Sequence, residues 1–335
     1  MKPNLFSIAT KELSQDAFIT WLIQWADDSF MSENEKLCRT GKAFVQKLLS
    51  SKYKISVDDI KSINAGRQWA NIDIWAEVNN KYIIIIEDKI DTNEHDNQLE
   101  RYRNTVEKEY GKTIKPVFIY IKTGLEALDN IRAIKNKGWE YISRKNFINF
   151  LESHNPKSEI YSDYLSNLLE IQTESESFSK YAQLNSWEAT KGLFSYIESK
   201  LSDDWTHWDY VPNAQGGFMG MWFHFTPCVS TEKCELYLQI ENYCTNRVNL
   251  FIKICGEWER TVDDLYYIFG IIKEKAEQFN LHISKPSRYR VGEYTSVAII
   301  DEVFIEKSNA DLDLINCINK IKSAISLVDT VAEMI

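Results

Sequence analysis

The stretch YIIIIEDK, residues 82–89, places the strongest constraint on what this chain can fold into. Four consecutive isoleucines are typical of a strand that is buried on both faces, as in the middle of an α/β sheet. That strand runs directly into Glu87, Asp88 and Lys89. Buried charges are costly unless they are paired or bind a metal. The sequence therefore predicts a charged site at the end of a buried strand.

The hydrophobic periodicity around this strand predicts an α/β domain. The order of helices and strands indicates an antiparallel meander of three strands that feeds one crossover connection. Ser14 is expected to cap the first helix, and Gly111 is expected to end the helix that follows the isoleucine strand. The expected elements are helices at 14–27 and 33–50, strands at 60–66, 72–78 and 82–89, a helix within 91–111, a strand at 115–122, and a short strand and helix over 139–153.

Charge divides the chain into two parts. Residues 1–155 carry 23 basic and 22 acidic side chains, whereas residues 156–335 carry 16 basic and 27 acidic ones. The first part can approach a polyanion, and the second should repel one. We expect a first domain at 1–155, a polar helical linker at 156–185 and an α+β domain at 186–335.

The second domain contains a cluster of aromatic residues that could stack unpaired bases. These residues alternate with a period of two in strand-like segments, so we expect them to form the core of a sheet instead. The cluster comprises Trp205, Trp208, Tyr210, Trp222, Phe223 and Phe225.

Several classes of protein are excluded by composition and by missing motifs. No apolar run approaches the roughly 20 residues needed to cross a bilayer, and the first residues lack the pattern of a signal peptide. We therefore expect a cytoplasmic protein without a membrane partner. The six cysteines show no CxxC spacing, which favours reduced thiols over zinc ligands or disulfides. The sequence has no Ser/His/Asp arrangement, glycine-rich phosphate loop or HExxH motif.

A further carboxylate, Asp73, lies in the strand that precedes the isoleucine strand. Opposite residues of an antiparallel pair share a face, so the register decides whether Asp73 and Glu87 can meet. A loop of only two residues would pair Asp73 with Ile86 and turn Glu87 away. A three-residue loop over 79–81 places Asp73 opposite Glu87, and a β-bulge would correct the register equally well.

In the second register, two carboxylates and the Lys89 ammonium converge at the end of the strand. Two carboxylates suit Mg²⁺, which binds one or two protein carboxylates together with waters and substrate phosphate oxygens. Such an ion activates water, and a neighbouring lysine can stabilise the charge that develops on a phosphodiester. The alternative is a structural salt bridge between Lys89 and these carboxylates, which the spacing alone does not distinguish from a metal site.

Asp73, followed by Glu87-x-Lys89 at the end of an isoleucine-rich strand, resembles the signature of the PD-(D/E)XK nuclease superfamily. Ile72 stands where that signature has proline. The resemblance covers about residues 1–150 and implies a restriction-endonuclease-like αβββαβ core. It also implies Mg²⁺ or Mn²⁺ held by Asp73, Glu87 and the backbone carbonyl of Asp88. Lys89 would then lie at the nucleophilic water, and the side chain of Asp88 would be structural.

Two further motifs carry the resemblance. Gln98 and Tyr102, in QLERY, resemble the QxxxY element of RecB-type members, and their i, i+4 spacing puts both on one helical face. The resemblance implies that they position the water or the scissile phosphate. ELSQDAFITWLIQWAD resembles the opening of bacterial members, in which an acidic residue of the first helix joins the catalytic and metal site. Glu12 is the candidate for that residue, and Asp16 is the alternative.

The resulting hypothesis is a metal-dependent nuclease, a phosphodiester hydrolase that acts on DNA in bacterial defence or repair. One alternative is a catalytically silent nuclease fold that binds nucleic acid or a protein partner. Another, based only on the acidic second half, is a structural or assembly protein. We expect the C-terminal domain to bind a partner protein, to join two copies of the chain or to limit access to the active site. A basic cluster at Lys285, Arg288 and Arg290 is the feature that most opposes this expectation.

Overall fold

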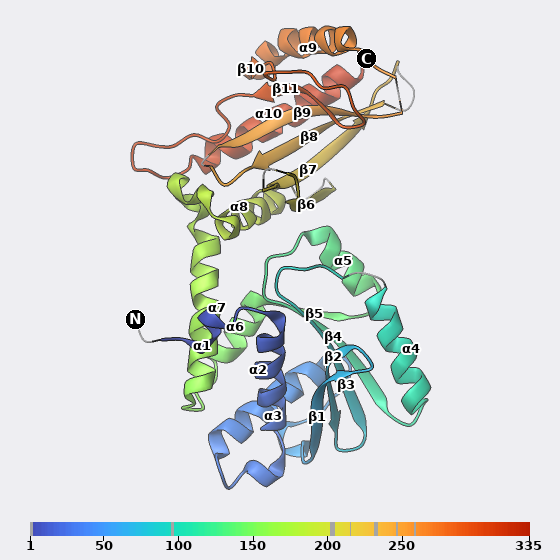
Figure 1. Ribbon diagram of the computed structural model, residues 1–335, viewed down its shortest axis with the longest axis vertical. Coiled ribbons are helices and arrows are strands. Elements are labelled where there is room, and N and C mark those ends of the chain that lie inside the picture. Colours follow the sequence, from blue (N-terminus) through green and yellow to red (C-terminus); the bar gives the residue numbers. More distant parts are fainter. Residues whose placement is uncertain are drawn as a thin grey trace. The chain divides into compact units, whose positions relative to one another are not determined.

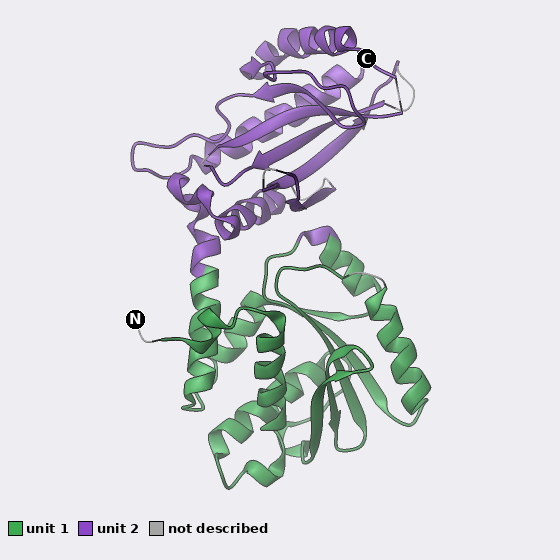
Figure 2. Cartoon of the chain, in the orientation of Figure 1, with its two compact units in different colours: residues 1–126, 130–172 green, residues 127–129, 173–335 purple. Residues whose placement is uncertain are grey.

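The structure is a computed structural model, and it describes residues 3–94, 97–201, 205–214, 216–230, 234–245, 247–257 and 259–335. The chain divides into two compact units (Figure 2). Unit 1 comprises residues 1–126 and 130–172, and unit 2 comprises residues 127–129 and 173–335. Each unit is built on a β-sheet of its own.

The sheet of unit 1 has five strands in the order β1-β2-β3-β4-β5. The first three pair antiparallel, whereas β4 and β5 continue the sheet in parallel with β3. The predicted meander is therefore present, but two crossovers follow it, through α4 (Gln98–Tyr110) and α5 (Leu128–Asn136). The sequence pattern did not predict α5, in which Ile134 is the buried residue. The strands are β1 (Ile63–Trp69), β2 (Ile72–Val78), β3 (Tyr82–Lys89), β4 (Lys115–Lys122) and β5 (Glu140–Ser143).

Helices cover both faces of this sheet (Figure 1). Ile84 and Ile86 of β3 pack in one core with Phe18, whereas Ile83 and Ile85 pack in a second core with residues of α4. This arrangement explains the isoleucine run, because successive side chains of a strand point to opposite faces and here both faces are covered. The other helices are α1 (Leu5–Ile8), α2 (Glu12–Gln24), α3 (Glu35–Ser50), α6 (Arg144–Glu152) and α7 (Glu159–Glu176), which crosses into unit 2.

Helix α2 begins two residues earlier than the sequence predicts. Lys11 occupies the N-cap position without a side-chain hydrogen bond, and Ser14 lies inside the helix, so the prediction of Ser14 as the cap is wrong. The Glu12 side chain accepts hydrogen bonds from the Ile90 N–H and from the Thr92 hydroxyl. These partners are distant in the sequence. The local pattern of capping residues therefore could not reveal that they help to fix the start of the helix.

The register of β2 and β3 is the one that the three-residue loop over 79–81 predicts. Val78 pairs with Tyr82, and the ladder continues in the same register to the pair of Ile74 with Ile86. Extended by one residue, this register places Asp73 opposite Glu87. The two carboxylates therefore share a face of the sheet, as the metal-site hypothesis requires.

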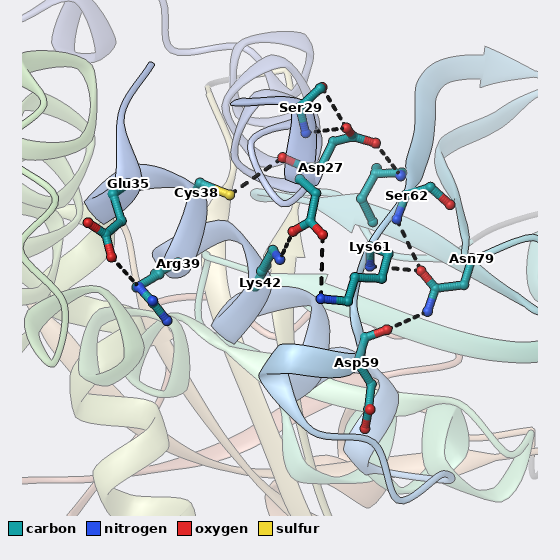
Figure 3. Close-up of polar contacts among 12 residues, drawn as sticks. Asp27, Ser29, Glu35, Cys38, Arg39, Lys42, Asp59, Lys61, Ser62 and Asn79 are labelled. Carbon is teal, nitrogen blue, oxygen red and sulfur yellow. Dashed lines mark hydrogen bonds and ion pairs between the residues drawn. The ribbon is translucent and has the colours of Figure 1, made fainter. Parts of the chain in front are cut away.

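The side chain of Asn79 holds the turn that sets this register (Figure 3). Asn79 and Asn80 have φ angles of 56° and 52°, in the left-handed region that asparagine adopts more readily than most residues. Asn79 Oδ1 accepts hydrogen bonds from the N–H groups of Lys61 at 2.9 Å and Ser62 at 3.1 Å. Its Nδ2 donates to the Asp59 carbonyl at 2.7 Å. The turn is thereby tied to the segment that leads into β1.

Unit 2 contains a six-stranded antiparallel sheet in the order β10-β11-β9-β8-β7-β6. Helix α10 packs against β7 and β8, and α9 packs against β11. The strands are β6 (Thr206–Val211), β7 (Phe218–Pro227), β8 (Cys234–Asn242), β9 (Val248–Gly256), β10 (Ile283–Ser284) and β11 (Thr295–Ile300). The helices are α8 (Trp187–Lys200), α9 (Val262–Ala276) and α10 (Leu314–Ala332).

The aromatic cluster of unit 2 does not form one core. Trp208 and Phe223 are buried as expected, but Trp205 and Tyr210 are 51% and 45% exposed. For these two residues the prediction of burial is wrong, because they lie in or next to β6, which is an edge strand of the sheet. The ring of Trp205 instead contacts that of Phe225 in an edge-to-face arrangement.

Two expectations about composition can be compared with the described residues. All six cysteines are free thiols, as their spacing predicts. In the described part of the chain, no helix combines the length and the apolar character that a membrane span requires.

Candidate functional site

The carboxyl end of β3 brings together three side chains that the sequence singles out. Glu87 and Lys89 alternate with Asp88 along the strand and point toward the α4 side, and Asp73 reaches the same face from β2. Lys89 Nζ forms an ion pair with Glu87 and lies 3.7 Å from Asp73 Oδ2. The same Asp73 oxygen accepts a hydrogen bond from the Asp88 backbone N–H at 3.2 Å.

Burial dominates the electrostatics of this cluster. Glu87 is fully buried, and neither of its oxygens has a partner in hydrogen-bond geometry among the described residues. Burial raises the pKa of Glu87 to about 8, a rise to which the Asp73 charge adds and which the Lys89 ammonium opposes. Burial by itself would lower the pKa of Lys89, but Glu87 and Asp73 outweigh it and the pKa is raised. Lys89 is therefore held in its charged form.

The donor set at this position fits a divalent cation. Mg²⁺ uses one or two protein carboxylates and completes its coordination with water and phosphate oxygens. Asp73 and Glu87 supply two carboxylates on one face, and the fully buried Glu87 is paired with the Lys89 ammonium. Within the described ranges, no group of three or more His, Cys, Asp or Glu residues is arranged to hold a metal ion.

Gln98 and Tyr102 lie on the face of α4 that covers this cluster. The Tyr102 hydroxyl donates to the Asn71 carbonyl, and Gln98 Nε2 donates to the hydroxyl oxygen at 3.3 Å. Burial raises the pKa of Tyr102, and the charges of Glu87 and Asp73 raise it further. The hydroxyl therefore stays neutral. Gln98 Oε1 is buried and, in the part of the chain that the structure describes, has no hydrogen-bond partner.

The two acidic residues of α2 occupy different places. Glu12 lies beyond the end of β3, where its Oε1 accepts from the Ile90 N–H at 3.1 Å and the Thr92 hydroxyl at 2.7 Å. Asp16 lies beside Asp88 on the opposite face of the strand, and burial raises its pKa to about 6 against the opposing hydrogen bond with Asp88. The structure therefore sets Glu12, rather than Asp16, beside the segment that leaves the site.

A buried polar network on the opposite face was not predicted from the sequence. Gln15 is 4% exposed, and its Nε2 donates to Asp88 Oδ1 at 2.7 Å and to the Lys89 carbonyl at 3.3 Å. Its Oε1 accepts from the hydroxyls of Thr123 at 2.7 Å and Tyr164 at 2.9 Å. The sequence contained one signal for this network. Gln15 is a polar residue among the buried residues of α2, and a buried polar side chain needs hydrogen-bond partners.

A second buried lysine, Lys122, was also not predicted from the sequence. It ends β4 in parallel register with Lys89 and is 1% exposed. Its Nζ donates to the Thr92 carbonyl at 3.0 Å and Asn93 Oδ1 at 2.6 Å, and it forms an ion pair with Glu126. Lys122 thereby fixes the segment that follows β3. The signal was a second apolar strand that, like YIIIIEDK, ends in lysine.

Comparison with models of protein families identifies a family for the first half of the chain. Residues 3–180 match the model of a family described as the PD-(D/E)XK nuclease superfamily. This range spans more than half of the chain and contains all the site residues described above. Searches of curated proteins and of solved structures found no match.

Proposed function

The chain belongs to the PD-(D/E)XK nuclease superfamily, and from this premise we propose that it is a metal-dependent nuclease that hydrolyses phosphodiester bonds of DNA. Family membership suggests a nuclease with a nucleic-acid substrate. The proposal adds DNA, the ion Mg²⁺ or Mn²⁺ and a setting in bacterial defence or repair. The observation that carries it is the convergence of Asp73, Glu87 and Lys89 on one face at the end of β3.

In this proposal Asp73, Glu87 and the Asp88 backbone carbonyl hold the divalent ion, with Glu12 as a further candidate ligand. When bound, such an ion neutralises charge on the phosphodiester and lowers the pKa of a coordinated water. Lys89 carries a positive charge that the two carboxylates stabilise. Its role is to orient the nucleophilic water and to stabilise negative charge that develops on the phosphate.

Gln98 and Tyr102 orient the reactants rather than bind the ion. Because the Tyr102 hydroxyl stays protonated, it can donate a hydrogen bond but does not act as a base at neutral pH. The buried Gln98 Oε1 offers an acceptor for a water molecule. Correct orientation contributes to the rate but is less decisive than the metal ligands. Gln98→Ala and Tyr102→Phe should therefore reduce cleavage by smaller factors than Asp73→Ala.

Unit 2 has a different role in this proposal, which is to bind a partner protein or a second copy of the chain. Unit 2, residues 127–129 and 173–335, carries 15 basic and 25 acidic side chains, a balance that opposes the approach of phosphate. The exposed Trp205 and Tyr210 supply aromatic surface of the kind that is enriched at protein interfaces.

The test is a cleavage assay with the full chain and labelled linear and circular, single- and double-stranded DNA and RNA. Mg²⁺, Mn²⁺ or a chelator is added in parallel reactions. DNA cleavage should require the metal and should be lost in Asp73→Ala and Glu87→Ala, with circular dichroism unchanged. Asp58→Ala, which removes an exposed carboxylate elsewhere in unit 1, should cleave like the wild type.

The possible failures of this assay separate the alternatives. Binding of nucleic acid without cleavage under any condition would indicate a catalytically silent nuclease fold. Cleavage of RNA alone would contradict DNA as the substrate. Undiminished cleavage by Asp73→Ala or Glu87→Ala, with contamination excluded, would show that the site lies elsewhere.

A further inference from the structure

Gln15 makes four buried hydrogen bonds with one side-chain amide. Two involve Nε2, which faces β3, and two involve Oε1, which faces the hydroxyls of Thr123 and Tyr164. The orientation of the amide follows from chemistry, because the Lys89 carbonyl can only accept and must therefore face a donor. Few other side chains of the same length as glutamine carry both a hydrogen-bond donor and an acceptor at their end.

The two hydrogen bonds from Gln15 to β3 hold Asp88 and Lys89. Asp88 follows one proposed ligand, Glu87, in the chain and contacts the other, Asp73, through its backbone N–H. The Asp88 side chain is held by Gln15 on one face of the strand. The Asp88 N–H donates at 3.2 Å to Asp73, whose carboxylate lies on the other face. Glu87 precedes Asp88 in the chain. A rotation of the Asp88 backbone therefore moves Glu87 directly and changes the contact that holds Asp73.

The hydrogen bonds between Gln15 and β3 are rigid because the residues around them are buried. Gln15, Asp88, Thr123 and Tyr164 are each less than 5% exposed, so water does not readily replace a broken hydrogen bond among them. The Lys89 carbonyl also accepts from the Thr123 N–H at 3.1 Å, which ties the end of β3 to the turn after β4. Gln15 thus connects the ligand-bearing strand to a rigid buried frame.

We propose that Gln15 is a positioning residue of the metal site, which orients the backbone at Asp88 and Lys89 so that Asp73 and Glu87 present their carboxylates to one divalent ion. This inference rests on the proposed nuclease function. Gln15 itself would not contact the ion, but it would raise the affinity of the site for the metal. Outer hydrogen-bond partners of metal ligands typically contribute about 10–100-fold to affinity.

The variants separate this role from general support of the fold. Gln15→Met keeps the length of the side chain and removes all four hydrogen bonds. Gln15→Glu keeps the acceptor for Thr123 and Tyr164 but loses the donor to the Lys89 carbonyl, and it provides a second test should the methionine variant not fold. Tyr164→Phe is the matched control, because it removes one buried bond from the same amide on the side away from β3.

The full chain is titrated with MnCl₂ alone by calorimetry, and its melting temperature is measured with and without Mn²⁺. Both Gln15 variants should weaken Mn²⁺ binding by about 10–100-fold and reduce the stabilisation that Mn²⁺ provides. In the DNA assay their kcat should fall while KM stays unchanged. Tyr164→Phe should lower the melting temperature of the metal-free protein but bind Mn²⁺ with affinity close to that of the wild type.

Each other outcome overturns the inference. If a folded Gln15 variant binds Mn²⁺ as the wild type does, Gln15 only supports the fold, and the proposed nuclease function is unaffected. If Tyr164→Phe weakens Mn²⁺ binding as much as Gln15→Met, the effect arises from the buried frame and not from the bonds to β3. If the wild type itself neither binds Mn²⁺ nor cleaves, the proposed function fails, and the inference fails with it.

Discussion

Replacement of Asn79 by glycine tests what sets the register of β2 and β3. Glycine adopts the φ of 56° without strain, so the change removes the side chain while keeping the backbone conformation. Three hydrogen bonds are lost, to Lys61, Ser62 and Asp59. At about 0.5–1 kcal/mol for each of these partly exposed bonds, the free energy of unfolding should fall by about 1.5–3 kcal/mol. For a domain of this size, at about 2–4 °C for each kcal/mol, the melting temperature should drop by about 3–12 °C.

Asn80→Gly is the matched control for this prediction. Asn80 has a φ of 52°, and its exposed side chain makes no hydrogen bond with the described residues. This variant should melt close to the wild type. Both proteins and the wild type are unfolded by heat and by urea, and the transition of unit 1 is followed by circular dichroism and tryptophan fluorescence.

Equal destabilisation by the two glycine variants would refute the reasoning, because it would assign the effect to the backbone of the turn rather than to the Asn79 side chain. No destabilisation by either would show that strand packing alone selects the register. The distinction matters for function, since a slip of one residue would turn Asp73 and Glu87 to opposite faces.

Three further predictions concern the site and unit 2. Lys89→Ala should abolish turnover while Mn²⁺ binding, measured by calorimetry, is kept; loss of Mn²⁺ binding would contradict the assigned role. Burial raises the pKa of Glu198 above its ordinary 4.5. The contribution of this carboxyl to stability is therefore fully present below pH 4.5 and is lost as pH rises through the folded pKa. Glu198→Gln should therefore flatten the dependence of melting temperature on pH, and an unchanged slope would contradict this. In the full chain, replacement of Lys285, Arg288 and Arg290 by glutamine should leave DNA binding at low salt unchanged; a large loss would make unit 2 a nucleic-acid-binding domain.

Three strands of unit 1 were predictable because their signals are local, whereas the first strand, expected at 60–66, lies at Ile63–Trp69. The predicted bounds of β2, β3 and β4 agree with the structure, since each is an apolar run with polar or turn-forming residues at its ends. The burial of β3 on both faces also follows from its isoleucines alone. Helix α5 was missed because its apolar stripe is short and most of its residues are partly or fully exposed.

The meeting of Asp73 and Glu87 was only partly predictable. The sequence allowed a two-residue turn, a three-residue turn or a bulge, and these alternatives differ in which face each carboxylate occupies. The hydrogen bonds of Asn79 to residues 59, 61 and 62 favour the three-residue turn. They join segments about 20 residues apart and have no counterpart in the local pattern.

Residue types and their spacing determined the candidate site of this protein: two carboxylates, a lysine and a QxxxY helix placed beside one buried strand. The tertiary structure decided which groups support them. Gln15 is separated in sequence by 73 residues from Asp88, by 108 from Thr123 and by 149 from Tyr164. Hydrophobic periodicity acts over a few residues and therefore encodes helices and strands, whereas a buried amide finds its partners only when distant segments pack together.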